Sequence, residues 1–185
     1  LAADYWYSKW RESDGRVTAT RIDPNGRACR EPVTFALSEW ELVLDQTSAV
    51  MNLHIPRGPR ITLADWRESI RRGFEYFEKV RPCAARPTAC VCRSWMFDPR
   101  LQDFLPETSG LVTLQKRLRL FPFVAPLETR CGFYFIFGED DVDLEDAPRD
   151  TSLRRALLDH AASGGVMTGG GMLIFKDEIE RQLAD

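Results

Sequence analysis

Two polar side chains near the middle of the sequence could carry out acid–base chemistry. Asn52 and His54 lie two residues apart in segment 49–56, whose composition predicts a β-strand closed by Pro56. Alternate residues of a strand point to the same face, so these two side chains lie together. A neutral imidazole at the end of a strand can act as a general base near pH 7. The alternative is a histidine that only forms a hydrogen bond to a neighbouring loop.

The next predicted strand, 89–97, adds a second set of candidates. Cys92 and Ser94 share one face of this strand, and Arg93 and Trp95 share the other. A thiol becomes a nucleophile when a nearby base or positive charge lowers its pKa. The histidine of the preceding strand would supply that base if the two strands are neighbours.

Two alternatives remain for the cysteines. Cys90 and Cys92 could be buried and pack as small hydrophobic residues, which would explain them without chemistry. Together with Cys83 they could also bind zinc, but the spacing fits no standard pattern and no second pair of ligands follows. We therefore predict no metal site.

Lys116 is a candidate for binding an anion. It interrupts an otherwise apolar row of alternate residues in predicted strand 111–121, formed by Val112, Leu114, Leu118 and Leu120. An ammonium group in such a row could contact a negatively charged ligand, or it could extend to water at the edge of a sheet.

Two loops look like ligand-binding motifs without completing them. The acidic segment 139–146 lacks the glycine and the final glutamate of a calcium loop, so it predicts a solvated loop. The glycine-rich segment 164–171 follows a predicted helix and enters a predicted strand. Phosphate loops usually follow a strand and open a helix, so we interpret this segment as a helix stop and a tight turn.

The composition limits the class of protein. The chain has 185 residues and a net charge of -3, which suits one domain and gives no general attraction for nucleic acid or anionic lipid. No apolar run approaches the roughly 20 residues that span a bilayer. The five irregularly spaced cysteines do not form the pattern of a secreted disulfide framework. We expect a cytoplasmic protein with reduced thiols, no nucleic-acid partner and no membrane partner.

Residues 1–48 predict a β-rich N-terminal lobe. Asp14-Gly15 is a strong hairpin signal, and the threonine-rich segment 17–22 predicts the strand after it. Pro24-Asn25-Gly26 marks the next turn. The sequence Ser38-Glu39-Trp40-Glu41 fits a capping box and predicts a short helix, although the apolar run 40–44 would also suit a strand.

Residues 49–185 predict alternating strands and helices. The best helix has Thr62 and Asp65 at capping-box spacing and ends before Pro82. Its apolar face consists of Leu63, Trp66, Ile70, Phe74 and Phe77. Further strands are predicted at 111–121, 131–137 and 172–175, and further helices after Asp98-Pro99, at 151–163 and in the tail 176–185. This order predicts an α+β fold with a mixed β-sheet flanked by helices.

Several segments taken together resemble a bacterial family named for its GNAT-like acyltransferase C-terminal domain. They cover about residues 40–175. The most distinctive are Val50-Met51-Asn52-Leu53-His54-Ile55-Pro56 and Cys92-Arg93-Ser94-Trp95-Met96-Phe97-Asp98-Pro99, followed by segments 114–118 and 150–157 and the glycine-rich turn before the last strand.

The resemblance implies a GNAT-like fold and an enzyme that transfers an acyl group from acyl-CoA to an amine on a small-molecule substrate. It also implies that the chain is the C-terminal part of a longer protein and that an N-terminal acyltransferase-like domain is its partner. The site candidates would then be His54 as base, Cys92 and Ser94 as acid or relay, Arg93 and Lys116 on the CoA phosphates, and Asn52 and Trp95 on the substrate.

One motif departs from the pattern of GNAT enzymes. Their Gln/Arg-x-x-Gly-x-Gly/Ala loop opens a helix and binds the CoA pyrophosphate, but the nearest segments here, 23–28 and 166–171, lack the leading residue and that context. CoA would then bind by another route or to the N-terminal domain. In the latter case the chain would be a non-catalytic domain that completes a cleft. A small-ligand binder without chemistry is a third alternative.

Overall fold

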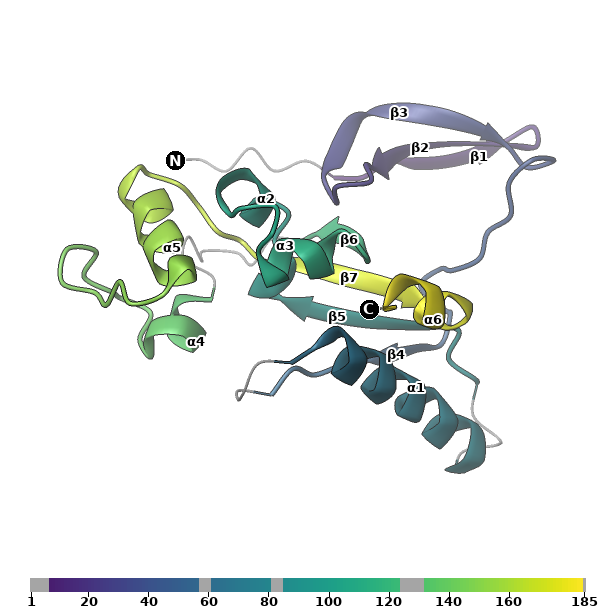
Figure 1. Ribbon diagram of the computed structural model, residues 1–185. Helices are drawn as coiled ribbons and strands as arrows, with labels where there is room; N and C mark the ends of the chain where they lie inside the picture. Colours follow the sequence, from purple (N-terminus) through teal and green to yellow (C-terminus); the bar gives the residue numbers. More distant parts are fainter. Residues whose placement is uncertain (1–6, 57–60, 81–84, 124–131, 185) are drawn as a thin grey trace.

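The computed structural model describes residues 7–56, 61–80, 85–123 and 132–184. Within them the strands form two sheets, one with the order β1-β2-β3 and one with the order β4-β5-β7-β6. Figure 1 shows the first sheet (purple) above the second and joined to it by a long connection. The strands of the first sheet end before residue 48, and those of the second begin after it.

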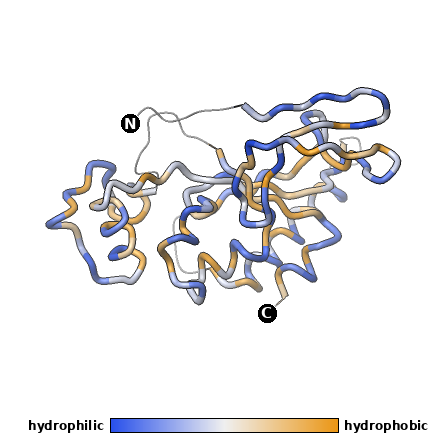
Figure 2. Tube along the Cα trace, turned by 90° about the horizontal axis from the view of Figure 1, so that it is seen from above, coloured by the Kyte–Doolittle hydropathy of each residue, from blue (hydrophilic) through white to orange (hydrophobic). Residues whose placement is uncertain are grey.

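The first sheet is an antiparallel meander of β1 (Trp10–Ser13), β2 (Arg16–Ile22) and β3 (Ala28–Ala36). Asp14 and Gly15 both have positive φ, which a two-residue hairpin turn requires, and the predicted hairpin is confirmed. The pairing of β2 with β3 shifts register after Thr20, so a β-bulge lies at this point. Hydrophilic residues follow much of this projecting sheet in Figure 2.

The second sheet is mixed. β4 (Val50–Asn52) runs parallel to β5 (Ala89–Ser94), and the crossover between them carries α1 (Leu63–Val80). β7 (Gly170–Phe175) lies antiparallel between β5 and β6 (Arg119–Pro122). A parallel pair needs such a crossover. The other two strands, β6 and β7, each follow a stretch of chain that lies outside the sheet.

Local sequence explains where α1 begins and which side it buries. The Asp65 carboxylate accepts hydrogen bonds from the Thr62 N–H and hydroxyl, and the Thr62 hydroxyl oxygen accepts one from the Asp65 N–H. This is the predicted capping box with aspartate in place of glutamate. Of the predicted apolar face Trp66, Ile70 and Phe74 are buried. The last residue of the face, Phe77, is 37% exposed.

One face of the second sheet is closed by α1 and by α6 (Ile179–Gln182), which follows a 3-10 turn at Lys176–Glu178. The predicted helical tail is thus confirmed over these residues. Gly73 lets α1 approach β4, because a side chain there would overlap Met51. The strand residues buried on this closed face are Met51, Cys90, Cys92, Leu120, Met172 and Ile174.

The intervening residues form the opposite face, which we call the open face. Its members are Asn52, Val91, Arg93, Arg119, Phe121, Gly171 and Leu173, which pair or alternate across the four strands. Asn52, Arg93 and Arg119 are exposed, and Val91, Phe121 and Leu173 are half-buried. Side chains on this face are therefore accessible to a ligand.

A second apolar cluster lies beyond the end of β5, at the left of Figure 1. β5 turns into a 3-10 helix, Trp95–Phe97, and α2 (Leu101–Phe104) and α3 (Gly110–Gln115) follow. α4 (Phe133–Phe137) and α5 (Ser152–Ala162) pack together there. Among the described residues, no helix is long and apolar enough to cross a membrane.

The predicted strand 111–121 is wrong over its first half. Ser109 caps α3 there, since its hydroxyl oxygen accepts a hydrogen bond from the Val112 N–H at 3.2 Å. Only its end forms β6. The row of alternate leucines mimics a strand, but Val112, Leu114 and Gln115 are buried as neighbours on a short helix.

Four other element predictions need correction. The predicted strand 49–56 ends at Asn52, so His54 lies beyond β4. Segment 133–137 is the helix α4 rather than a central strand, because Gly132 and Gly138 at its ends adopt positive φ; Cys131 lies outside the described residues. Segment 38–44 forms turns and irregular chain instead of a helix or a strand. Strand 89–97 ends at Ser94, whose hydroxyl caps the 3-10 turn.

Candidate functional site on the open face

The carboxyl ends of β4 and β5 come apart at the centre of the candidate site. Their last residue pair is Asn52 with Val91, and one further hydrogen bond runs from the Leu53 N–H to the Val91 carbonyl at 2.8 Å. β5 continues to Ser94, beyond the end of β4. The crevice outside the carboxyl ends of parallel strands is where α/β proteins bind ligands.

The structure brings three of the predicted site residues to this end of the sheet. Asn52 and His54 are both exposed. β4 ends at Asn52, so His54 follows the strand by two residues, while Arg93 lies on the open face of β5, two residues after Val91. A base and a cation thus border the point where the strands separate.

Arg93 has an aromatic neighbour on the same face. Its guanidinium carbon lies 5.3 Å from the centre of the Phe123 ring, within the range of a cation–π contact. Arg93 also pairs with Gly171, which pairs in turn with Phe121 on the far strand. A side chain at Gly171 would overlap the Phe121 ring, so this ring lies across the glycine.

Cys92 is not brought together with His54. Cys90 and Cys92 are free and buried on the closed face, whereas His54 is exposed beyond the end of β4. Burial raises the pKa of the Cys92 thiol to about 11, and burial together with the neighbouring Cys92 raises the pKa of Cys90 to about 12. Both thiols are protonated near pH 7, as packing residues would be. Cys83 lies outside the described residues.

The next two candidates mark the exit of β5. The Ser94 hydroxyl oxygen accepts a hydrogen bond from the Met96 N–H at 3.3 Å, which caps the 3-10 turn. Trp95 is half-buried against the second apolar cluster, where a side chain at Gly132 would overlap its indole. Both residues therefore have structural contacts that explain them.

Lys116 lies at the opposite edge of the sheet from His54. It caps the C-terminal end of α3, just before β6, and its amine lies 3.3 Å from the Glu107 carboxylate. Because β7 lies between β6 and β5, the strand that carries Arg93, Lys116 and Arg93 are not on neighbouring strands. The row of apolar residues that suggested a buried lysine belongs to two different elements.

A groove with a volume of about 680 Å³ lies beside Lys116, where the end of β2 meets β6. Four cations line it, namely Arg21, Lys116, Arg117 and Arg119. Phe121 and Leu173 add apolar surface from the open face. No signal in the sequence indicated this groove, because Arg21 of β2 lies far in the sequence from the other three cations, which follow α3 or lie in β6.

A family model for the GNAT-like C-terminal domain matches residues 7–173, most of the chain that carries this face. The chain belongs to the GNAT-like C-terminal domain family. Among curated proteins no match was found.

Solved acyltransferase structures share the fold of this GNAT-like domain. A mutant acyltransferase in complex with octanoyl-CoA is 19% identical, with a TM-score of 0.59 over 90% of this chain. An acyltransferase in complex with decanoyl-CoA and teicoplanin is 20% identical, with the same TM-score and coverage. The likeness confirms the predicted GNAT-like α+β fold. The chain spans 46% of the length of each of these structures.

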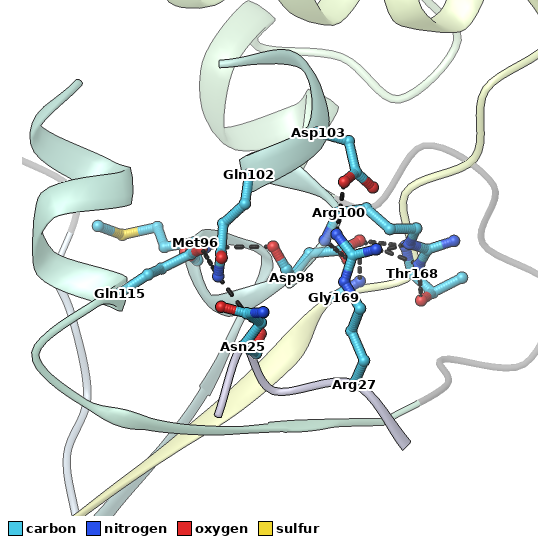
Figure 3. A network of polar contacts seen from close by, with 10 residues as sticks. All are labelled: Asn25, Arg27, Met96, Asp98, Arg100, Gln102, Asp103, Gln115, Thr168 and Gly169. Carbon is cyan, nitrogen blue, oxygen red and sulfur yellow. Dashed lines mark hydrogen bonds and ion pairs between the residues drawn. The ribbon is translucent and has the colours of Figure 1, made fainter. Parts of the chain in front are cut away.

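A buried polar network holds the strand ends of this GNAT-like domain in place (Figure 3). Asp98 is fully buried, and one carboxylate oxygen accepts hydrogen bonds from the Thr168 and Gly169 N–H groups at 2.9 and 3.2 Å. Arg100 donates to both carboxylate oxygens at 3.0 Å. The carboxylate thus ties the exit of β5 to the entry of β7.

Gln115 extends the network to the first sheet. Its amide nitrogen donates to the carbonyls of Met96 and Asp98, at 2.7 and 3.1 Å. Its oxygen accepts from the Gln102 amide, which also donates to the Asn25 carbonyl. These contacts bridge segments up to 77 residues apart, so the sequence alone gave no signal for them.

Gly26 allows the turn after β2 to pack closely against β6, and we call this contact the seat of Gly26. It is buried with φ of 84°, and a side chain there would overlap Leu120. Arg27 and Asp103 form an ion pair beside it. This seat fixes the end of β2 over the edge of the second sheet and forms one wall of the groove.

The connection from β4 to α1 has the strand–loop–helix order that phosphate loops use. Segments 23–28 and 166–171, which the sequence comparison with GNAT phosphate loops singled out, lie outside this connection. The connecting sequence contains Arg57, Gly58 and Arg60, which lie outside the described residues. Among the described residues, no group of three or more metal-binding side chains occurs.

Proposed function

We propose that this chain is the acyl-CoA-binding half of an acyltransferase that moves the acyl group to an amine. The observation that carries the proposal is the separation of β4 and β5 after Leu53, with His54 exposed directly beyond it. Membership of the GNAT-like family and the shared fold with acyltransferases support it. The neighbours' bound acyl-CoA makes this donor the natural one to test.

The open strand ends suit the donor chemically. The pantetheine arm of acyl-CoA contains two amide groups, and an extended chain with amides can pair with a free strand edge. The edge of β5 past Val91 offers such a position, because β4 has ended. The thioester would then lie near His54, at the border of the open face.

His54 is the proposed general base. The acceptor amine attacks the thioester carbonyl, so that a C–N bond forms and the C–S bond breaks. His54 takes the proton that the amine loses, and CoA leaves as a thiolate that is protonated by water. The exposed imidazole is free to meet an acceptor from the open face. Asn52, on the same face, is the proposed contact of the acceptor.

The remaining candidates take supporting roles in this proposal. Arg93 lies beside the strand opening and is the proposed contact for negative charge on the donor. Cys92 packs in the core, and Ser94 caps a turn. A bacterial cytoplasm, where thiols remain reduced, is the proposed setting.

The first test is calorimetric titration of the chain with decanoyl-CoA and with CoA. Micromolar binding of decanoyl-CoA that weakens at least tenfold in Arg93→Gln is expected, since a charge-assisted contact is lost. Arg11→Gln, an exposed change on β1, is the matched control. Absence of binding at millimolar ligand would refute the proposed donor site in this chain and favour a supporting role for it.

The second test is turnover of the full-length protein. His54→Ala is expected to lower kcat by about 10² to 10⁴, the usual contribution of a general base. Gln46→Ala, exposed in the loop before β4, should leave turnover unchanged. An unchanged rate in His54→Ala would show that another group takes the proton.

A further inference from the structure

The groove beside β6 gathers positive charge at the edge of the second sheet opposite β4, the strand that precedes His54. We propose that it binds a carboxylate of the acceptor, so that the acceptor is an extended molecule with its amine at one end and an acid group at the other. This inference rests on the proposed acyl transfer for the position of the amine. The position and the charge of the groove do not depend on that reaction.

Arg21 is the cation most available to a ligand. It is exposed, and among the described residues no ion pair or hydrogen bond of its side chain is recorded. The register shift after Thr20 places it at a β-bulge, a feature that re-aims side chains next to binding sites. A guanidinium matches a carboxylate in shape and can bind it through two hydrogen bonds.

Lys116 is the second available cation. Its only recorded partner within the described residues is Glu107, whose side chain is 87% exposed, and its own side chain is 48% exposed. Exposed pairs of this kind contribute little, so a bound carboxylate can replace Glu107 at small cost.

The other two cations are held in place by the protein. Arg117 donates to the carbonyls of Gln182 and Ala184, and Arg119 forms an ion pair with Glu178. They give the groove a fixed positive wall. Among the described lining residues Asp23 is the one carboxylate, and it accepts the N–H groups of Asn25 and Arg27.

The strand order of the second sheet sets the minimum distance between His54 and the groove. Arg93 pairs with Gly171 and Gly171 pairs with Phe121, so β5, β7 and β6 are aligned at this level. Three spacings between adjacent strands separate β4 from β6, so His54 and the groove are at least about 14 Å apart. Half-buried Phe121 and Leu173 offer apolar contact along the path. An extended peptide covers this distance with four or five residues, at roughly 3.3 Å each.

Pentaglycine and pentaglycinamide test the inference directly, since they differ only in the terminal carboxylate. Each is titrated into ¹⁵N-labelled protein, and amide shifts are followed by NMR. Pentaglycine is expected to bind about tenfold more tightly than the amide, the effect of one charge-assisted contact. The shifts should centre on Ile22, Leu120, Phe121 and Leu173.

Variants assign the preference to the groove. Arg21→Gln and Lys116→Gln should each remove most of the tenfold difference. Arg16→Gln, an exposed change at the other end of β2, should leave the difference intact. Equal binding of the two peptides, or a preference that survives in Arg21→Gln, would overturn the inference.

The binding test separates this inference from the proposed reaction. Carboxylate preference in a protein that does not bind acyl-CoA would support the groove and refute the donor site. Acyl transfer at equal rates to pentaglycine and pentaglycinamide, unaffected by Arg21→Gln, would support the reaction and overturn the groove assignment.

Discussion

On one face of the second sheet, alternate residues of four strands lie buried under α1 and α6, and on the other face the intervening residues remain accessible. Cys92 and Arg93 are adjacent in sequence, but one thiol is 2% exposed and the neighbouring guanidinium reaches solvent. Because successive side chains of a strand point to opposite faces of the sheet, one strand contributes residues to both faces.

The comparison shows how the chemistry of a polar residue depends on its side of the sheet. Burial keeps the Cys92 thiol protonated, which removes it from nucleophilic chemistry at neutral pH. Arg93 and Arg119 on the open face, and His54 beyond the end of β4, are exposed. Because α1 buries the thiols on its side of the sheet, only the polar residues outside the closed face remain as candidate site residues.

The largest expected difference between the faces is in stability. Ile70→Ala removes a fully buried side chain of α1 and should lower the free energy of unfolding by roughly 2 to 5 kcal/mol. Val91→Ala, on the open face, should cost about 0.8 kcal/mol, because its side chain is only half-buried. Urea unfolding of both variants measures the difference, and equal losses would contradict the division into closed and open faces.

Cys92→Ser sharpens the comparison from the buried side. A hydroxyl in place of the thiol, in an apolar core, should cost roughly 1 to 3 kcal/mol in unfolding free energy. Titration with decanoyl-CoA should give unchanged affinity, since this side chain faces away from the open face. Loss of decanoyl-CoA binding in a folded Cys92→Ser protein would show that the thiol belongs to the binding site.

Alkaline pH gives a second measurement on the same thiols. Folding raises the pKa of Cys90 and Cys92 through burial, so the unfolded chain loses these protons first. Their contribution to stability is complete below about pH 8.5, the ordinary pKa of a thiol. It should disappear as the pH rises toward their folded values. Replacing both by alanine should make unfolding less sensitive to pH in that range.

The smallest expected effect concerns Glu178, which holds Arg119 of the open face. Hydrogen bonds from Arg119 lower the pKa of the Glu178 carboxyl. Its contribution to stability is therefore present above the unfolded pKa, near 4.3, and is lost as the pH falls through the folded value. Glu178→Gln should cost up to about 1 kcal/mol at pH 7, since Arg119 is half exposed. The variant should also lose less stability than the wild type between pH 5 and 3 in thermal unfolding.

Local signals predicted the elements that depend on nearby residues. The Thr62–Asp65 capping box and the apolar face of α1 lie within one helix, and the Asp14-Gly15 turn needs only two residues. α3 was missed because its alternating leucines fit a strand, and the Ser109 cap was the signal that could have corrected this.

The candidate site was predictable only in part, for a related reason. Strand alternation predicted Asn52 and His54 on one face, but β4 ends at Asn52, so this rule does not extend to His54. Whether Cys92 faced them depended on the position of α1, and the groove depended on contacts between Gly26 and Leu120 across 94 residues. Such distant contacts leave no periodic pattern in the sequence.

The seat of Gly26 also bears on how related chains can be compared. A residue with a side chain at this position would have to push β6 away or adopt an unfavourable φ, and either change would alter the wall of the groove. Glycine at this position therefore serves as a marker. In an alignment, chains that keep this glycine are those in which a groove of this shape is expected, whatever residues they carry around His54.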